Sequence, residues 1–367
     1  DDSILFSPAP AGNYDRELPG QMLASIGGIW NYYLHTGDKQ TIAEVYEGVR
    51  MYLDVWQLRQ DGTLVERQGD WYWGDWGLLK DIPLLYNAWY FLALNSFLQM
   101  SEMLGKTDEA ALTRDKLTAF HSAFNRAFWD GSGYRTPDYE GKYDDRAQAI
   151  AVVSGLAGTD KYDELLRIFR SSYLASPYME KYVLEALFIM GEEEFGLRRM
   201  KERFHNMVLL SPYTTLYENF GPRDQLDKSA FIGYGTNNHG WSGGGLIILS
   251  QFVAGISPIE PAYQTFRVRP QLGSLKQVTA QVPSVSGMIE VEINTSETTY
   301  EMRLKVPENT VANVHLPKAY TLLTADGEMV IQNKKLSKRH PYKLVEEDET
   351  TIVLAIPSGE HVFTGKN

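Results

Sequence analysis

Residues 68–77 gather two aspartates and three tryptophans within seven positions. Tryptophan faces stack on the apolar faces of sugar rings, and carboxylates accept paired hydrogen bonds from sugar hydroxyls. Because tryptophan in a long polar loop is costly unless it contacts something, we interpret this segment as a sugar-binding loop. The alternative is an aromatic loop core whose aspartates cap the next helix. The candidate sugar contacts are Asp70, Trp71, Trp73, Asp75 and Trp76.

A second segment, residues 214–222, places Glu218 among aromatic residues and before a Gly-Pro turn. A carboxyl group in a dry aromatic pocket suits general acid or base work on a glycosidic bond. Tyr217, directly before it, is a further candidate for substrate binding. The alternative is a glutamate at a helix end that pairs with Arg223.

A third segment, residues 236–245, reads Thr-Asn-Asn-His-Gly-Trp-Ser-Gly-Gly-Gly. Either asparagine can cap the helix that follows, which places His239 and Trp241 at the start of that helix. The glycines allow the helix to pack closely on its neighbours. A lone histidine is usually structural, but the nearby tryptophan makes substrate binding an equal alternative for both residues.

The remaining sequence argues against several other kinds of chemistry. It has no cysteine, and its seven histidines form no metal-binding pattern. It also lacks glycine-rich nucleotide loops, so we predict neither a metal nor a cofactor. The net charge of −12, without a basic cluster, argues against nucleic acid as a partner.

The longest apolar stretches, residues 84–100 and 240–256, contain Asn, Gln or several Gly. We interpret both as buried helices and predict no membrane insertion. The sequence leaves the compartment open, between the bacterial periplasm or exterior and the cytoplasm.

Up to about residue 256, helix-period patterns follow one another. Tight breaks join them in pairs, each with a glycine at the helix C-terminus: Gly37, Gly105, Gly158 and Gly191. The predicted helices cover roughly 18–35, 39–59, 82–104, 108–128, 143–157, 160–172, 178–190, 193–209 and 238–255.

Most connections between these hairpins are longer than the breaks inside them. They cover residues 60–81, 129–143 and 210–237, with 173–177 as the short exception. Hairpins that place their long loops at one end predict an (α/α) toroid with a loop-built mouth. An open right-handed solenoid is the alternative.

After about residue 259 the pattern changes to alternating apolar and polar residues between Pro, Gly and Asn turns. This predicts an antiparallel β-sandwich of six to eight strands. Pro258 and Pro261 stop helix propagation at the change. We therefore expect two domains, a helical catalytic domain at 1–258 and a C-terminal β-sandwich at 259–367.

These patterns together resemble glycoside hydrolase family 78, the bacterial and fungal α-L-rhamnosidases, from about Tyr14 to the C-terminus. The resemblance implies an (α/α)6 barrel followed by a β-sandwich, and hydrolysis of terminal α-L-rhamnosides with inversion. It implies a rhamnose-containing oligosaccharide or glycoside as the partner. The matching features are Tyr32-x-x-x-Thr36-Gly-Asp38, the Gly-Asp-Trp and Asp-Trp-Gly loop, Thr215-Leu-Tyr-Glu218, Asn238-His239-Gly-Trp241-Ser-Gly-Gly, and Ala254-Gly-Ile-x-Pro258 leading to Arg269-Pro270.

The resemblance also implies roles for single residues. Glu218 matches the general base that activates water, while His239 and Trp241 match the wall opposite the rhamnose pocket. The residues that match the pocket itself are Asp70, Trp71, Asp75 and Trp76.

The general acid of the family has no counterpart in this sequence. It lies in an early barrel helix that reads Asp-Cys-Pro-x-Arg-Glu, followed by Trp-x-Gly-Asp, and residues 15–17 lack that context. About nine long helices are predicted, whereas a full barrel has twelve. We therefore expect the chain to be the C-terminal part of a longer enzyme, and a poor enzyme alone. An opened ring would expose apolar helix faces, which favours a homodimer.

Two other functions remain open at this point. A carbohydrate-binding module without catalysis would keep these aromatics but lack a second carboxylate opposite Glu218. Another (α/α)-barrel glycosidase, such as an unsaturated-uronide hydrolase, would favour Arg or Lys near the sugar carboxylate, and the three segments are poor in both.

Overall fold

The computed structural model describes residues 18–67, 72–210, 214–220, 236, 238–333, 335–337 and 340–367. It divides into two compact units. The first holds the described residues of Asp1–Asn31, Asp38–Glu192 and Arg198–Gly244. The second holds the described residues of Tyr32–Gly37, Glu193–Leu197 and Gly245–Asn367. The main break along the chain thus lies between Gly244 and Gly245, and the domain boundary at 258–259 stays a prediction.

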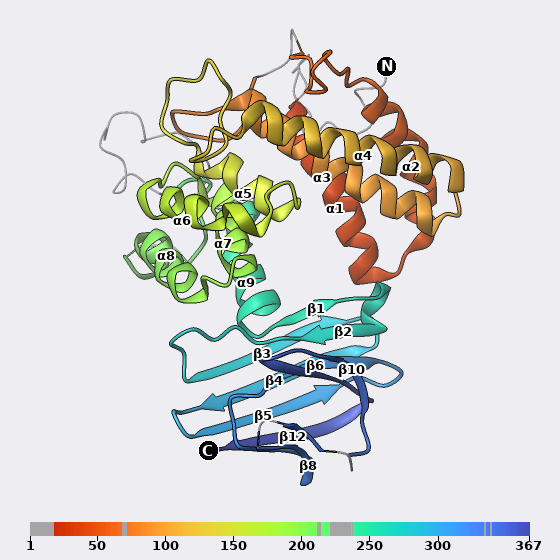
Figure 1. The fold of residues 1–367 in the computed structure, drawn as a ribbon, viewed down its shortest axis with the longest axis vertical. Coiled ribbons are helices and arrows are strands. Elements are labelled where there is room, and N and C mark those ends of the chain that lie inside the picture. The colour runs from red at the N-terminus through yellow and green to blue at the C-terminus, as the bar shows by residue number, and fades with distance from the viewer. Residues whose placement is uncertain are drawn as a thin grey trace. The chain divides into compact units, whose positions relative to one another are not determined.

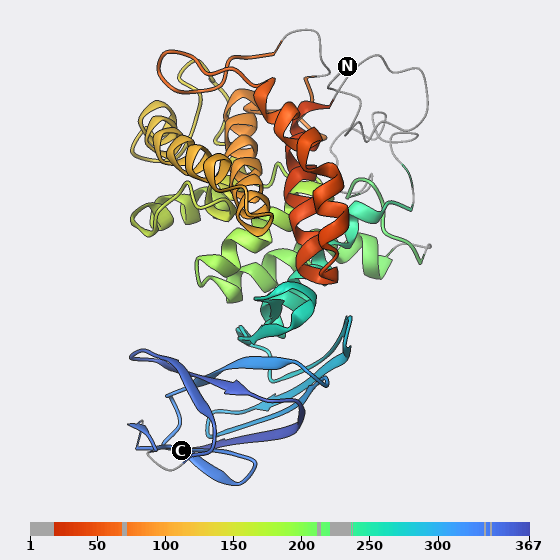
Figure 2. The ribbon, with the colours of Figure 1, turned by 90° about the vertical axis from the view of Figure 1, so that its right-hand side faces the viewer.

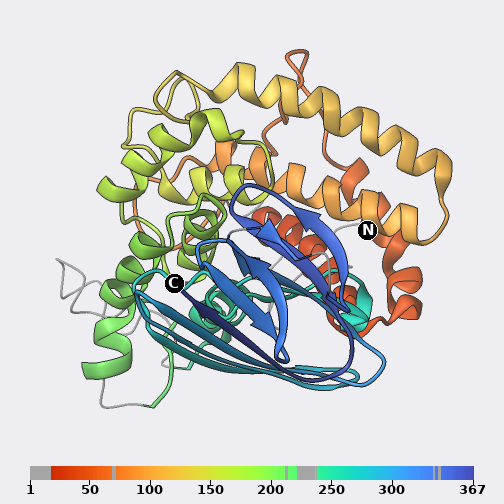
Figure 3. The ribbon, with the colours of Figure 1, turned by 60° about the horizontal axis from the view of Figure 1, so that its bottom comes forward.

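The helices follow the order predicted from the sequence (Figures 1 and 2). They are α1 (Pro19–Thr36), α2 (Lys39–Asp54), α3 (Ile82–Met103), α4 (Thr107–Phe128), α5 (Asp145–Val153), α6 (Tyr162–Ser171), α7 (Pro177–Ile189) and α8 (Glu193–His205). A 3₁₀ turn (Thr159–Lys161) precedes α6, and a π-helix (Asn206–Leu210) follows α8. Helices α3 and α4 lie side by side (Figures 1 and 3), and α3 is buried along most of its length. No helix in the described part of the chain is long and apolar enough to cross a bilayer.

Helix α2 ends at Asp54, whereas the sequence predicted residue 59. The chain instead forms a small hairpin, in which the backbone N–H of Val65 donates to the carbonyl of Gln57 at 2.9 Å. At its tip the Asp61 carboxylate accepts the N–H of Thr63 at 2.9 Å, and Gly62 has a φ of +88°. This local Asp-Gly turn satisfies the backbone without a helix.

The glycine signals are confirmed at three of the four hairpin turns. Gly37, Gly105 and Gly191 have φ values of 72°, 70° and 78°. The prediction for Gly158 is wrong, because α5 ends earlier and Gly155, with a φ of 82°, takes the left-handed position.

The helix predicted over 238–255 is broken into three short pieces. They are a 3₁₀ turn (Gly240–Gly243), α9 (Gly244–Ile248) and a π-helix (Leu249–Val253). A Cβ on Gly244 would lie 2.4 Å from the Cβ of Lys181 on α7, so close packing at this point requires glycine. Several glycines in succession lower the helix propensity, which agrees with the short pieces.

The strands form a five-stranded sheet, in the order β1-β2-β6-β11-β10, and a seven-stranded sheet, in the order β3-β4-β5-β12-β7-β8-β9. Their bounds are β1 (Ile256–Pro258), β2 (Thr265–Val268), β3 (Gln277–Ser284), β4 (Gly287–Thr295), β5 (Thr299–Val306), β6 (Val311–Pro317), β7 (Leu322–Ala325), β8 (Glu328–Gln332), β9 (Lys335–Leu336), β10 (Lys343–Glu347), β11 (Thr351–Ile356) and β12 (Gly359–Lys366).

Alternate strand residues from both sheets form one apolar core, as the alternation predicted. The described residues contain twelve strands, more than the six to eight predicted, because strands of two to five residues give too little alternation. One pair, β2 with β6, is parallel, so the sheet is not purely antiparallel as expected.

Candidate active site

The first unit contains a cavity of about 520 Å³ among the three segments singled out in the sequence. It is more apolar than polar, which suits a ligand with an apolar face. The described residues that line it are Leu18, Gln21, Ala24, Ser25, Trp73, Trp76, Tyr178, Tyr182, Glu218, His239 and Trp241.

Glu218 is held in this cavity by two N–H donors from different parts of the chain. The indole Nε1 of Trp76 donates to its Oε1 at 2.9 Å, and the backbone N–H of Thr236 donates to its Oε2 at 2.8 Å. A carboxylate has about four acceptor sites, so each oxygen keeps capacity for a further donor. The group is therefore oriented but still able to accept a hydrogen bond from a water or a sugar.

Backbone pairing fixes Glu218 to the third segment. Its N–H donates to the carbonyl of Thr236 at 2.9 Å, and the indole Nε1 of Trp241 donates to its carbonyl at 2.9 Å. The N–H of His239 donates to the carbonyl of Leu216 at 2.9 Å. These hydrogen bonds therefore join residues 216–218 to residues 236 and 238–241, although the two segments are separated in the sequence.

The His239 side chain lies beside the carboxylate. Its Nδ1 is 3.6 Å from Oε2 of Glu218 and 2.8 Å from the hydroxyl of Thr236. Its ring lies against Trp241, with ring centroids 4.1 Å apart. This contact sets the angle of the imidazole in the cavity.

The aromatic side chains of the cavity stack on one another. Trp73 and Trp241 are nearly parallel, at 13° and 6.1 Å between centroids. Tyr178 stacks on Trp73 at 6.1 Å and lies 5.2 Å from Trp241, while Trp76 meets Trp73 edge-on at 5.7 Å. The result is a rigid aromatic wall that needs little reordering when a flat ligand binds.

Two helices contribute residues that the sequence reasoning missed. Gln21 and Ser25 come from α1, and Tyr178 and Tyr182 come from α7. The spacing of four in each pair places its members on one helix face. That spacing, near the start of each helix, is the signal that could have identified them.

Asp75 lies behind the cavity, fully buried, and is absent from the described lining. Its carboxylate accepts the N–H of Ser176 at 2.8 Å, the Ser176 hydroxyl at 2.5 Å and the N–H of Trp76 at 2.8 Å. Burial raises the pKa of Asp75 to about 6, although Arg146, 3.6 Å away, acts in the opposite direction. The structure thus places Asp75 as a support for Trp76, where the sequence predicted a sugar contact.

Arg146 ties down the loop that carries the tryptophans. Its guanidinium donates to the carbonyls of Trp76, Leu78 and Leu79 at 3.0–3.2 Å and pairs with Asp144 at 2.6 Å. Leu79 has a φ of +54°, a costly conformation for leucine, and the bond to its carbonyl helps to hold it. The sequence reasoning missed this group, although Asp-Asp-Arg at the start of a predicted helix was a visible signal.

A second buried ion cluster holds the next loop. Arg199 of α8 pairs with Glu180 at 2.6 Å and with Asp145 at 2.8 Å, and all three side chains are fully buried. The Asp145 carboxylate also accepts the N–H of Leu174 at 3.2 Å. Arg203 also lies 3.5 Å from Glu180, and Arg199 donates to the carbonyl of Ser172 at 2.9 Å. Because a buried charge without its partner is costly, this cluster holds residues 172–174 in place before α7.

The remaining predicted site residues have different outcomes. Asp70 and Trp71 lie outside the described residues. Tyr217 contributes its backbone: its carbonyl accepts the hydroxyl of Ser242, and its N–H donates to the sulfur of Met207 at 3.4 Å. Within the described part of the chain, no group of three or more His, Asp or Glu residues is placed to hold a metal.

Comparison with known proteins decides the family. The model of the bacterial alpha-L-rhamnosidase 6 hairpin glycosidase domain matches residues 10–174, and that of the bacterial alpha-L-rhamnosidase C-terminal domain matches residues 255–329. The chain belongs to the α-L-rhamnosidases of glycoside hydrolase family 78. This confirms the resemblance and the fold class: helical hairpins of the six-hairpin glycosidase type, followed by a C-terminal sheet domain.

An alpha-L-rhamnosidase of Streptomyces avermitilis is 23% identical over 384 residues, which cover 99% of this chain and 34% of that protein. The structure of an alpha-L-rhamnosidase from Dictyoglumus thermophilum has a TM-score of 0.79 at 21% identity and covers 95% of this chain and 40% of that one. A Streptomyces avermitilis alpha-L-rhamnosidase solved with L-rhamnose has a TM-score of 0.73 at 19% identity, covering 94% of this chain and 33% of that one. This rhamnosidase-family chain therefore spans about a third of the curated relative, and the structural likeness shows a shared fold.

Proposed function

We propose that this chain forms the sugar-binding and general-base part of an inverting α-L-rhamnosidase that removes terminal α-L-rhamnose from glycosides. The observation that carries the proposal is the Glu218 carboxylate, oriented by Trp76 and Thr236 in an aromatic cavity. Family membership and the relative solved with L-rhamnose support the choice of sugar.

In inversion, a base draws a proton from a water while the water oxygen attacks the anomeric carbon from the face opposite the leaving group. Glu218 has free acceptor capacity for that water. The N–H donors on both oxygens keep the carboxylate from rotating. Holding the water at an attacking angle lowers the entropy cost of the step.

The leaving oxygen needs a proton from a second carboxyl group, typically about 6.5–9.5 Å from the base. Within the described residues, Glu218 supplies the one carboxylate that lines the cavity. We therefore propose that the general acid comes from outside this described lining.

The cavity favours a deoxy sugar over an acidic one. The apolar methyl group and ring face of rhamnose match the wall formed by Trp73, Trp241 and Tyr178. The described lining contains no Arg or Lys that could pair with a sugar carboxylate, which argues against an unsaturated-uronide hydrolase.

The test is Glu218→Gln in the full-length protein, assayed on nitrophenyl α-L-rhamnoside. We expect kcat to fall by about 10²–10⁴-fold, as for other general bases, while L-rhamnose still binds. Glu202→Gln, at an exposed position on α8, is the matched control and should keep full activity. A Glu218→Gln enzyme that retains the normal rate would refute the assignment.

Two further measurements test the stereochemistry. With Glu218→Ala, azide should restore turnover and yield the β-linked rhamnosyl azide, because a small anion can replace the activated water. Proton NMR of the unmodified enzyme should show β-L-rhamnose as the first product. If the α-anomer forms first, the enzyme is retaining and the proposed role of Glu218 is wrong.

One observation favours a second function, a carbohydrate-binding module without catalysis: the single carboxylate in the described lining. The isolated 367-residue chain and a longer protein that contains it separate the two. Rhamnose binding by both, with hydrolysis by the longer protein alone, supports the enzyme with an external acid. Binding without hydrolysis in both supports the module. The homodimer stays a prediction, and light scattering on the same samples tests it.

A further inference from the structure

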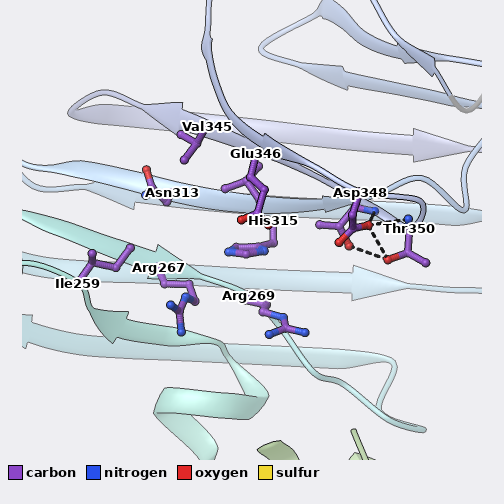
Figure 4. A pocket seen from close by; sticks show the side chains of 11 residues that line it. Ile259, Arg267, Arg269, Asn313, His315, Val345, Glu346, Asp348 and Thr350 are labelled. Carbon is purple, nitrogen blue, oxygen red and sulfur yellow. Dashed lines mark hydrogen bonds between the residues drawn. The ribbon is translucent and has the colours of Figure 1, made fainter. Parts of the chain in front are cut away.

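The second unit has its own cavity, of about 330 Å³, on the outward face of the five-stranded sheet (Figure 4). Phe266 and Val268 of β2 are buried in the core, whereas Arg267 and Arg269 are exposed. Side chains alternate along a strand, so both arginines leave the same face of the sheet. The parallel register of β2 and β6 sets Asn313 beside Arg267.

Neither guanidinium forms a hydrogen bond or an ion pair with a residue in the described part of the chain. Figure 4 shows the imidazole of His315 between these arginines and Glu346. Burial, together with the positive charges of Arg269 and Arg267, lowers the pKa of His315 to about 4, so this ring is neutral near pH 7. This side of the cavity therefore presents two guanidinium groups without a described partner. It also presents two neutral polar side chains, those of Asn313 and His315.

The opposite wall carries Glu346 and Asp348. One oxygen of Asp348 accepts the N–H groups of Thr350 and Thr351 at 2.7 and 2.8 Å, which fixes the carboxylate and leaves its other oxygen available. The apolar side chains of Val345 and Val353 also line the cavity. The cavity thus has a cationic side, an anionic side and apolar surface.

This arrangement fits a ligand with one negative charge, several hydroxyls and an apolar ring face. Arginine pairs with carboxylates through two parallel hydrogen bonds. Carboxylates accept hydrogen bonds from hydroxyls, and Glu346 and Asp348 would repel a dianion such as phosphate. A sugar acid meets all three conditions.

We propose that this cavity binds a hexuronate residue of an acidic glycan, with its carboxylate on Arg267 and Arg269 and its hydroxyls toward Glu346 and Asp348. The choice of a carboxylate rests on the charges of the cavity. The choice of a sugar rests on the proposed function of the chain. The site would hold an acidic glycan independently of the step at Glu218.

The test is titration calorimetry on the whole chain carrying Glu218→Gln, with methyl glucuronide and methyl galacturonide, each against its neutral methyl glycoside. We expect at least one uronide to bind about tenfold or more tightly than its neutral partner, since a charge-assisted pair is lost with the carboxylate. The double variant Arg267→Gln and Arg269→Gln should weaken uronide binding by about tenfold or more.

Arg303→Gln on the seven-stranded sheet is the matched control, because Arg303 is also an exposed strand arginine, paired with Glu301. Circular dichroism checks that each variant is folded. If the double variant does not fold, Arg269→Lys is used instead, because it keeps the positive charge but removes the paired hydrogen bonds of the guanidinium. The proposal is overturned if neither uronide binds, if the neutral glycosides bind equally well, or if the arginine variants bind unchanged.

Inorganic phosphate is the last ligand to be titrated. If phosphate binds as tightly as the uronide, the cavity is a simple anion site and the sugar assignment is overturned. The binding assay reports on this cavity even if the protein shows no rhamnosidase activity. Failure of one proposal is therefore distinguishable from failure of the other.

Discussion

The two cavities of this molecule are built in different ways. The cavity around Glu218 is formed by loops together with α1 and α7, and ion clusters fully buried behind it hold those loops in place. The cavity around Arg267 lies on strands whose positions are set by backbone register, and its charged groups are exposed.

The difference shows where a protein needs buried polar groups. Strands satisfy their backbone groups through the sheet, so outward side chains there are free to vary. Loops lack the regular backbone hydrogen bonds of a sheet, so their N–H and C=O groups need other partners. Asp81 and Arg146 supply these partners: the Asp81 carboxylate accepts the N–H of Thr136 at 2.7 Å, and Arg146 donates to three carbonyls.

The largest expected effect is at the ion cluster around Arg199. Arg199→Met should lower the free energy of unfolding by about 3–5 kcal/mol, because it leaves Asp145 buried without its ion-pair partner and leaves Glu180 with the more distant Arg203, at 3.5 Å. Urea denaturation followed by tryptophan fluorescence measures the change. Arg167→Met, on α6 in an exposed pair, should cost no more than about 0.5 kcal/mol. Equal losses in both variants would contradict the comparison.

The second expected effect is a pH dependence from Asp75, whose folded-state pKa of about 6 lies above its ordinary 3.8. Folding therefore favours the protonated carboxyl, and this contribution to stability is full below about pH 4 and is lost as the pH rises through about 6. The free energy of unfolding should fall over this range relative to Asp75→Asn, by about 3 kcal/mol at most.

Chemical denaturation of both proteins from pH 4 to pH 7 measures this difference. Asp115→Asn, at an exposed position on α4, is the matched control. A difference between the unmodified protein and Asp75→Asn that does not change with pH would show that Asp75 has the same proton affinity in the folded and unfolded states.

A smaller effect is expected at Trp76, whose indole orients Glu218. Trp76→Phe keeps most of the aromatic surface but removes the N–H donor. We expect kcat to fall about tenfold, equal to about 1.4 kcal/mol in the activation barrier. Trp129→Phe, outside the described lining of the cavity, should leave kcat unchanged. Equal rates for both variants would mean that this hydrogen bond does not orient the base.

The smallest effect is expected on the sandwich. Arg267→Gln should change the free energy of unfolding by less than about 0.5 kcal/mol, since the guanidinium is exposed and has no partner in the described residues. Thermal melting checks this. A loss of several kcal/mol would show that Arg267 stabilises the sheet, as Arg199 stabilises the helical unit.

Much of the fold was predictable because it depends on local signals. Helix-period patterns located the helices, and glycine at the turns located three of the four hairpins. The misses were also local: Asp61-Gly62 ended α2 early, and Gly155 rather than Gly158 took the left-handed position. In both cases two nearby sequence signals could each mark the end of the helix. The hydrogen bonds of the turn that formed determined which one did.

The site was predictable in part. The residue types at Trp73, Trp76, Glu218, His239 and Trp241 indicated sugar chemistry, and the structure brings all five to one cavity. Nothing local indicated that Asp75, one position before Trp76, would turn inward to Ser176 and Arg146. In a loop, no period fixes the direction of a side chain, so sequence spacing cannot separate a support from a contact.

The sequence by itself determined the family, the two kinds of secondary structure and the residue types available for catalysis. Only the tertiary structure decided which groups share a cavity, because Glu218 meets Trp76 across 142 positions of sequence. The same holds for the two arginines of the sandwich, whose neighbours come from the pairing of β2 with β6. Local propensities act over a few residues, whereas these contacts depend on chain segments that burial and backbone pairing bring together.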